Sequence, residues 1–341
     1  MIARARAPLR LGLAGGGTDV SPYCDLHGGA VLNATIDRYA YATVEDATGQ
    51  EVLLEALDRG VAWSGTNLTT VPPELRLLAG TYRRICDQFL DGERPPLRLR
   101  TFSDAPPGSG LGSSSTMVVA VVAALSEYFQ IPLGEYDLAR IAYVIERGDL
   151  ALAGGKQDQY AAAFGGVNFM EFSADDHVIV NPLRIKQSIQ AELEASIVLY
   201  FTGISRESAN IIQEQRRNAR DNVGDAVQAM HELKQEAVAM KESLLKADFA
   251  AMAATFQRGW ESKKRMTRSI SNPLIDATEA VARRNGALAT KISGAGGGGF
   301  MMFMCDPVDR LRLSAALVRE GGHIMDVHFT RHGAFSWRTT R

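Results

Sequence analysis

The chain has 341 residues and a formal net charge of −2, with 46% hydrophobic and 22% charged residues. These values are ordinary for a globular protein of about two domains, and they exclude a strongly basic protein that binds nucleic acid through its charge. No apolar stretch reaches the ~18 residues of a membrane span, so we expect no membrane partner. The three cysteines have no metal-like spacing and indicate reduced thiols in a cytoplasmic protein.

The N-terminal segment predicts a strand over residues 2–14 that runs into the turn Gly15-Gly16-Gly17-Thr18-Asp19. Consecutive glycines let the backbone pass close to a ligand, and the aspartate that follows could accept hydrogen bonds from hydroxyl groups. An Asx-type turn would explain Asp19 equally well. Partial alternation over residues 29–46 predicts two strands broken near Asp37-Arg38, followed by a strand at 51–56 and a helix at 73–90.

Residues 106–116 are the most informative stretch, Pro-Pro-Gly-Ser-Gly-Leu-Gly-Ser-Ser-Ser-Thr. A predicted strand (97–102) precedes it and a predicted helix (113–130) follows. Alternate glycines at 108, 110 and 112 allow positive φ, and a helix N-terminus favours an anion, so the unit predicts a phosphate cradle. It is not a Walker loop, because no Gly-Lys-Ser/Thr follows, and a plain tight turn is the alternative.

Two carboxylates are candidates for chemistry. Asp158 follows Gly154-Gly155-Lys156-Gln157 at an expected helix start, where it could orient a substrate hydroxyl for attack on a phosphoryl group or simply cap the helix. Glu146 lies on the preceding helix, predicted at 135–152. It could share Mg²⁺ with a serine hydroxyl or lie on a solvated face.

The rest of the chain predicts strands at 167–172, 177–185 and 196–202, and about four helical segments between Ser205 and Arg284. A strand at 287–293, a glycine run, a strand at 300–304, a helix after Pro307 and a last strand at 323–330 complete the pattern. Strands and helices without regular alternation predict an α+β protein, with a domain boundary near residue 190.

The glycine run at 294–299 satisfies the spacing of a dinucleotide-binding fingerprint, with glycines at 294, 296 and 299. That fingerprint requires a following helix. The apolar run Phe300–Cys305 instead predicts a strand, which favours a hairpin whose backbone covers a ligand; a plain glycine-rich hairpin is the alternative.

Several of these segments together resemble the GHMP kinases. Residues 106–115 resemble the second motif of that superfamily, and Lys291-Ile-Ser-Gly-Ala-Gly-Gly-Gly-Gly-Phe300 its third motif. Gly154 to Gln159 is similar to its Gly-x-x-Asp-Gln segment. Ala-Gly-Gly-Gly-Thr-Asp at 14–19, with His27-Gly-Gly-Ala30, is most similar to the heptose 7-phosphate kinases, and fucokinases share part of the pattern. Galactokinases have a Gly-Glu-His-Thr-Asp version instead.

The resemblance implies a fold and a set of site residues. The fold would be a ribosomal-S5-like N-terminal domain (1–190) that binds ATP and a ferredoxin-like C-terminal domain (191–341). Asp158 and Arg10 would be catalytic, and Ser114 and Glu146 would bind Mg²⁺. The triphosphate would lie on Pro107, Gly108, Ser109, Gly110, Leu111, Gly112, Ser113, Ser114 and Ser115. The substrate would contact Gly16, Gly17, Thr18, Asp19, Gly294, Ala295, Gly296 and Gly297.

The implied reaction is transfer of the γ-phosphate of ATP to the anomeric 1-hydroxyl of D-glycero-D-manno-heptose 7-phosphate, for nucleotide-activated heptose and surface polysaccharide. A fucokinase-like or other sugar 1-kinase and a non-catalytic sugar- or nucleotide-binding relative are the alternatives. We expect a monomer or homodimer. A 7-phosphate requires a basic pocket, for which the candidates are Arg10, Arg38, Lys156 and Arg206.

Overall fold

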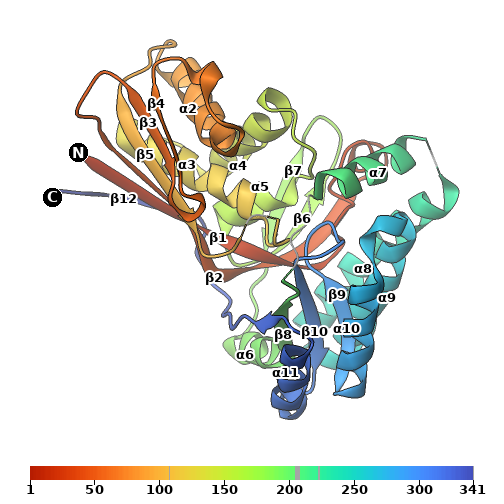
Figure 1. The fold of residues 1–341 in the computed structure, drawn as a ribbon. Helices are drawn as coiled ribbons and strands as arrows, with labels where there is room; N and C mark the ends of the chain where they lie inside the picture. Colours follow the sequence, from red (N-terminus) through yellow and green to blue (C-terminus); the bar gives the residue numbers. More distant parts are fainter. Residues whose placement is uncertain (107, 204–207, 222, 341) are drawn as a thin grey trace.

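The protein is described from a computed structural model that covers residues 1–106, 108–203, 208–221 and 223–340. It contains two sheets with helices packed against them (Figure 1). The predicted α+β class is confirmed, since strands and helices alternate irregularly along the chain.

The first sheet has eight strands, and its main path runs β12-β1-β2-β5-β3-β4. On one side of this path β2 also pairs with β6, which pairs with β7. Strands β3 and β5 are parallel, and the other paired neighbours are antiparallel. The strands are β1 (Ile2–Ala14), β2 (Gly29–Asp46), β3 (Val52–Ala56), β4 (Val61–Gly65), β5 (Leu97–Ser103), β6 (Val167–Phe172), β7 (Val178–Pro182) and β12 (Phe335–Thr339).

The prediction of two strands over residues 29–46 is wrong, because β2 runs unbroken through Asp37-Arg38. Its first part pairs with β6 and its second part with β5, so the strand changes partner where the alternation is lost. Between these parts Ile36 forms an isolated bridge with Phe329 and Asp37 N donates to His328 O at 2.8 Å. The loss of alternation near Asp37 therefore marks the point where β2 changes its pairing partner, and not the end of a strand.

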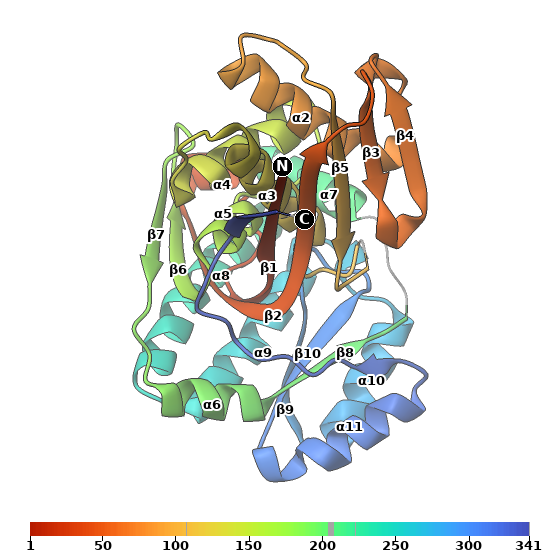
Figure 2. The ribbon, with the colours of Figure 1, turned by 90° about the vertical axis from the view of Figure 1, so that its left-hand side faces the viewer.

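The second sheet is antiparallel, with the order β11-β8-β10-β9, and lies below the first sheet in Figure 2. Its strands are β8 (Ile197–Phe201), β9 (Ala287–Ile292), β10 (Phe300–Cys305) and β11 (His323–Ile324). The predicted strand at 323–330 is thus mostly wrong, since only His323 and Ile324 form a strand and Phe329 forms an isolated bridge. The sequence analysis missed β12, where Phe335 and Trp337 alternate with polar residues and the chain returns to pair with β1.

Most of the predicted helices are confirmed. The sequence analysis did not predict α1 (Tyr23–His27) or α6 (Gln187–Ser196). The other helices are α2 (Arg76–Phe89), α3 (Ser113–Phe129), α4 (Glu135–Tyr143), α5 (Gln157–Phe164), α7 (Ser208–Arg220), α8 (Gly224–Leu245), α9 (Phe249–Met266), α10 (Pro273–Arg284) and α11 (Arg310–Arg319). Helix α4 continues as a π-helical turn (Val144–Asp149) where the sequence predicted one α-helix to residue 152. None of the helices in the described ranges is long and apolar enough to cross a membrane.

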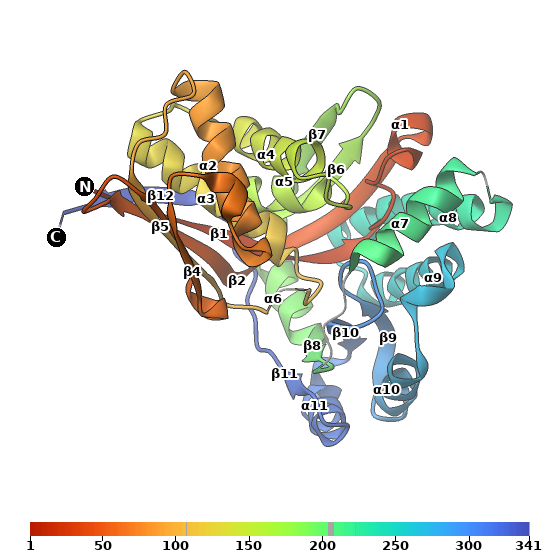
Figure 3. The same cartoon turned by 45° about the horizontal axis from the view of Figure 1, so that its top comes forward.

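Helices α2 to α5 cover one face of the first sheet, and α8 to α10 lie beside the second sheet (Figures 1 and 3). Helix α3 is apolar on nearly all sides, because it is enclosed by strands and by neighbouring helices. A second core cluster joins β1 and β2 to β8, β10 and helices α8 and α9. The domain division at residue 190 remains a prediction, and β12 crosses back over it.

Candidate active site

The loop before α3 has the backbone that its glycines predict. Gly108, Gly110 and Gly112 have φ angles of 72°, 84° and 78°. Gly112 is the N-cap of α3, and no side chain caps this helix end. The first N–H groups of α3 therefore remain available to an anion, as a phosphate cradle requires.

The glycine run between β9 and β10 packs directly on this loop. Phe300 N donates to Ser109 O at 2.9 Å, and a Cβ on Gly110 would lie only 2.3 Å from Ser293 O. A Cβ on Gly294 would lie 2.7 Å from Gly110 Cα. Because a strand and not a helix follows the run, the hairpin itself is confirmed and the dinucleotide-binding interpretation is wrong; that the hairpin covers a ligand stays a prediction.

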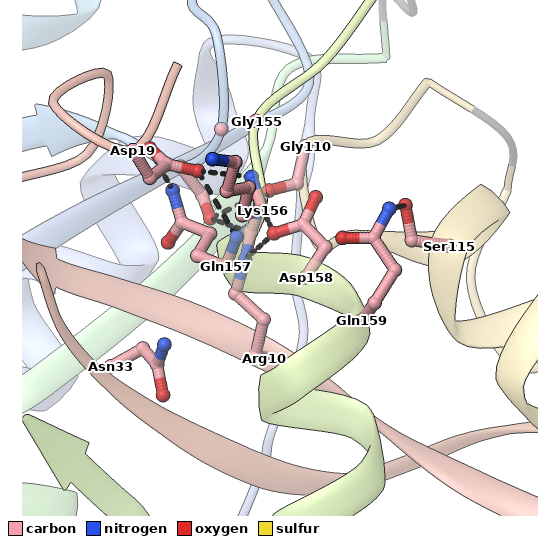
Figure 4. Close-up of polar contacts among 12 residues, drawn as sticks. Arg10, Asp19, Asn33, Gly110, Ser115, Gly155, Lys156, Gln157, Asp158 and Gln159 are labelled. Carbon is pink, nitrogen blue, oxygen red and sulfur yellow. Dashed lines mark hydrogen bonds and ion pairs between the residues drawn. The ribbon is translucent and has the colours of Figure 1, made fainter. Parts of the chain in front are cut away.

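Arg10 and Asp158 form the central ion pair of the site (Figure 4). Arg10 Nε and Nη2 each lie 2.7 Å from Asp158 Oδ1, and Arg10 Nη1 donates to Gly110 O at 2.6 Å. Arg10 is 4% exposed, whereas the Asp158 side chain is 24% exposed. The arginine thus fixes a carboxylate that remains accessible at the first turn of α5.

Asp19 lies at the same helix start but faces its backbone (Figure 4). Its Oδ2 accepts hydrogen bonds from Lys156 N at 2.9 Å and Gln157 N at 3.1 Å, and its Oδ1 accepts from Gly17 N and Gln157 Nε2. A Cβ on Gly155 would lie 1.9 Å from Asp19 Oδ2, so a larger residue at this position would clash with the Asp19 carboxylate. Asp19, buried at 1% exposure, therefore holds the start of α5.

Two further predicted residues lie at the site: Glu146, on the π-helical turn after α4, and Ser114, in the first turn of α3. Glu146 lies on the π-helical turn, is 2% exposed, and accepts a hydrogen bond from Gln159 Nε2. Gln159 Nε2 also donates to Ser115 Oγ at 3.1 Å, and Arg147 Nη1 lies 3.6 Å from Glu146 Oε1. Among the described residues no three His, Cys, Asp or Glu side chains cluster as a metal site.

These groups surround one cavity, which we call the central pocket, with a volume of about 240 Å³. Most of the predicted site residues line it, namely Arg10, Gly108, Gly110, Gly112, Ser113, Ser114, Ser115, Glu146, Asp158, Gly294, Ala295 and Gly296. Predicted residues outside its lining are Ser109, Leu111, Gly297 and the turn Gly16, Gly17, Thr18 and Asp19. Pro107 lies outside the described residues.

The sequence analysis missed two buried lysines behind the pocket. Lys263, in the last turn of α9, donates to Gly294 O. Burial, followed by the charge of Arg10, lowers the pKa of Lys263 to about 8. Lys291 donates to Leu13 O at 3.1 Å, and burial, followed by the charge of Lys263, lowers its pKa to about 7. No local pattern distinguishes these lysines from solvated ones, because their partners are remote in sequence.

The residues proposed for a 7-phosphate do not form one pocket. Arg10 lines the central pocket, but Arg38 lies at the middle of β2 and pairs with Asp37 at 3.4 Å. Lys156 points away, with Nζ 2.8 Å from Asp176 Oδ1. Burial lowers its pKa, but the Asp176 hydrogen bond and the charges of Cys24, Tyr143 and Asp176 together raise it above the ordinary value. Arg206 lies outside the described part of the chain.

Comparisons with known proteins agree with this geometry. The chain matches the GHMP kinase N-terminal domain over residues 76–166 and the GHMP kinase C-terminal domain over 240–323. It is 45% identical to a D-glycero-alpha-D-manno-heptose 7-phosphate kinase of Campylobacter jejuni over 339 residues, which covers 98% of each chain.

Two solved structures are also similar along almost their full length. One is described as a D-glycero-D-manno-heptose 1-phosphate kinase from Bacteroides thetaiotaomicron (42% identity, TM-score 0.83, covering 99% of this chain and 100% of that one). The other is a putative sugar kinase from Campylobacter jejuni (43% identity, TM-score 0.81, covering 99% and 98%). With both domain models matched and a relative at 45% identity, this chain belongs to the GHMP kinases.

Proposed function

We propose that this kinase transfers the γ-phosphate of ATP to the anomeric 1-hydroxyl of D-glycero-D-manno-heptose 7-phosphate and so forms the 1,7-bisphosphate. The product would be a precursor of nucleotide-activated heptose, which is used in the synthesis of surface polysaccharide. The substrate is inferred from the Campylobacter jejuni relative, which is named for it. We infer a cytoplasmic reaction, because the three cysteines are buried and unpaired and thiols persist in a reducing compartment.

The observation that supports this reaction best is the accessible Asp158 carboxylate held by Arg10 in front of the α3 N-terminus. Phosphoryl transfer depends on positioning and charge stabilisation more than on covalent chemistry. In the proposed arrangement Asp158 faces the acceptor hydroxyl and either orients it or accepts its proton. Arg10 keeps that carboxylate in one orientation and adds positive charge near the transferred phosphoryl group.

The chain offers a suitable environment for ATP. The glycine loop, the uncapped N-terminus of α3 and the hydroxyl groups of Ser113 to Ser115 face the central pocket. Backbone N–H groups at such a helix start bind phosphate oxygens without a lysine. We assign the triphosphate to this loop and the sugar to the side of the pocket near Asp158 and the hairpin residues Gly294 and Ala295.

The donors also fit Mg²⁺. The ion prefers oxygen ligands and is usually held by one or two carboxylates together with substrate phosphates. Ser114 and Glu146 both line the central pocket and supply a hydroxyl and a buried carboxylate. When bound, the metal would neutralise charge on the phosphate oxygens. Gln159 would orient the Glu146 carboxylate by the hydrogen bond it already donates.

The test is an ADP-release assay with Mg-ATP and heptose 7-phosphate, heptose 1-phosphate, mannose, L-fucose, galactose and mevalonate as acceptors. We expect a strong preference for heptose 7-phosphate, with a new anomeric phosphate in the ³¹P NMR spectrum of the product. Turnover only on a free sugar would support the kinase activity but contradict the proposal that heptose 7-phosphate is the acceptor. ATP binding without turnover on any acceptor would favour the non-catalytic alternative.

A further inference from the structure

A second pocket lies between α7 and the segment that follows the first glycine turn. We call it the α7 pocket; its volume is about 660 Å³. One wall is Ser21 and Pro22, and the other wall is formed by α7, through Asn210, Gln213, Glu214, Arg216, Arg217 and Arg220. Figure 3 shows α7 beside α1, which begins directly after Pro22.

The α7 pocket is positively charged. Arg216 and Arg217 are exposed and form no ion pair with any described residue. Arg220 pairs with Asp221 at 3.1 Å. Glu214, the one acid among the described lining residues, accepts a hydrogen bond from Ser269 Oγ at 2.8 Å. Two guanidinium groups are therefore available to an anion, and the planar guanidinium suits phosphate.

One face of α7 connects this pocket to the central pocket. Ala209 and Ile212 line the central pocket, and Arg216 lines the α7 pocket. Their spacing of three and then four residues puts them on the same helical face. Arg216 is only about 6 Å beyond Ile212 along the helix axis, at 1.5 Å per residue. The central pocket and the α7 pocket therefore have neighbouring walls on α7.

Between Ile212 and Arg216 along α7 lies a buried polar group, Gln215, whose amide nitrogen has no partner among the described residues. Gln215 is 2% exposed, and its Nε2 finds no hydrogen-bond acceptor among the described residues. A Cβ built on Gly17 would lie 3.9 Å from Gln215 Oε1 and 2.9 Å from the Met266 methyl carbon. Residue 17 is therefore closely packed against Met266, and Gln215 lies at the point where the glycine turn meets α7.

We propose that Arg216 and Arg217 bind the phosphate at the far end of the acceptor, while its anomeric hydroxyl lies at Asp158. This inference rests on the proposed function, because only a phosphorylated acceptor needs such a site. In heptose 7-phosphate the phosphate sits at the end of the exocyclic chain, away from the reacting hydroxyl. One acceptor would then span both pockets along α7, with Arg216 and Arg217 at its phosphate end.

The experiment compares Arg216→Gln, Arg217→Gln and the double variant with wild type, using heptose 7-phosphate and the dephosphorylated heptose as acceptors. We expect the double variant to lower kcat/KM for heptose 7-phosphate about 100-fold, mainly through KM, because two charge-assisted contacts are lost. The ratio of kcat/KM for the phosphorylated over the unphosphorylated acceptor should fall by a similar factor. Arg83→Gln, which removes an exposed arginine on α2, is the matched control and should leave that ratio unchanged.

The possible results separate the two proposals. If wild type uses heptose 7-phosphate and the double variant retains its preference for the phosphorylated acceptor, the arginine site is wrong and the proposed function remains. An equal loss on both acceptors would also reject the arginine site, since it would reflect a general defect. If wild type does not use heptose 7-phosphate at all, both the proposed function and the phosphate site fail.

Discussion

Gly112 packs against Asp158, so that a Cβ at residue 112 would lie 3.2 Å from the Asp158 carboxyl carbon. The glycine loop before α3 and the accessible carboxylate are therefore in direct contact at the central pocket. Arg10 reinforces this contact, since one guanidinium binds Asp158 and the carbonyl of Gly110. A small displacement of either element would change the distance between donor phosphate and acceptor hydroxyl.

The first prediction concerns Asp158. We expect Asp158→Asn to lower kcat by about 10²–10⁴-fold, because a group that orients or deprotonates the acceptor typically contributes that much. The Kd for ATP should change less than about 3-fold, since Asp158 faces the acceptor in the proposed arrangement. Steady-state kinetics and ATP titration measure both values. Near-normal turnover in the variant would remove Asp158 from the mechanism.

The second prediction concerns the contact between the glycine loops. Gly110→Ala places a Cβ 2.3 Å from Ser293 O, at a residue with φ of 84°. Gly92→Ala is the matched control, because Gly92 has φ of 83° and open space around it. The control should lose about 1–2 kcal/mol of unfolding free energy through backbone strain.

Gly110→Ala should lose about 1–3 kcal/mol more than this control, because its Cβ overpacks the interface between the loops. It should also weaken ATP binding, which the control should not do. Urea unfolding and ATP titration of both variants test the expectation. Equal losses of stability and unchanged ATP affinity in both would show that loop contact has no role in binding.

The third prediction concerns the cap that Asp19 forms on α5. Asp19→Ala should reduce the unfolding free energy by about 2 kcal/mol and lower kcat about 10–100-fold, since it frees the helix start that presents Asp158. Asp248→Ala, which removes the exposed N-cap of α9, should cost about 1 kcal/mol and leave kcat unchanged. A higher KM for the sugar with unchanged kcat in Asp19→Ala would instead indicate that Asp19 contacts the sugar.

The fourth prediction is a pH dependence of stability. Burial lowers the pKa of Lys263 to about 8 from 10.5, so between these values the unfolded chain holds a proton that the folded protein lacks. Stability rises with pH wherever the unfolded state binds more protons. Wild type should therefore gain stability relative to Lys263→Met as the pH rises from about 8 to 10.5.

The groups that act on Lys263 are Arg10, which lowers its pKa, and Asp19 and Asp158, which raise it. Lys291 belongs to the same buried group, because the charge of Lys263 lowers its pKa in turn. Urea unfolding at pH 7.5 and pH 10 measures the effect, with Lys264→Met on the same helix as control. Parallel pH dependence in wild type and Lys263→Met would contradict the prediction.

The sequence predicted those parts of the site that depend on local chemistry. Positive φ at Gly108, Gly110 and Gly112, the start of α3 and the hairpin after Gly294 follow from glycine spacing and from the residues that flank it. The resemblance named Arg10 and Asp158 as catalytic residues, but their ion pair was not predicted, since 148 residues separate them.

Other features could not be predicted because tertiary contacts decide them. Asp19 was a candidate sugar ligand, yet its oxygens face the backbone of Lys156 and Gln157, 137 and 138 residues away. Lys263 and Lys264 are adjacent, but one is buried behind Gly294 and the other pairs at the surface with Glu261. Likewise β2 continues past Asp37 because its first part pairs with β6 and its second part pairs with β5.

The pairing of β12 with β1 has a consequence for synthesis of the protein. The residues that hydrogen-bond to Ile2–Arg6 are Phe335–Thr339, so one edge of β1 lacks its partner until almost the whole described chain has been translated. At 5–20 residues per second this interval is about 15–65 s. An unpaired strand edge can add a strand from another chain during that time. Nascent molecules on the ribosome are thus exposed to misassembly at β1, and chaperones that shield this edge would raise the yield of native protein.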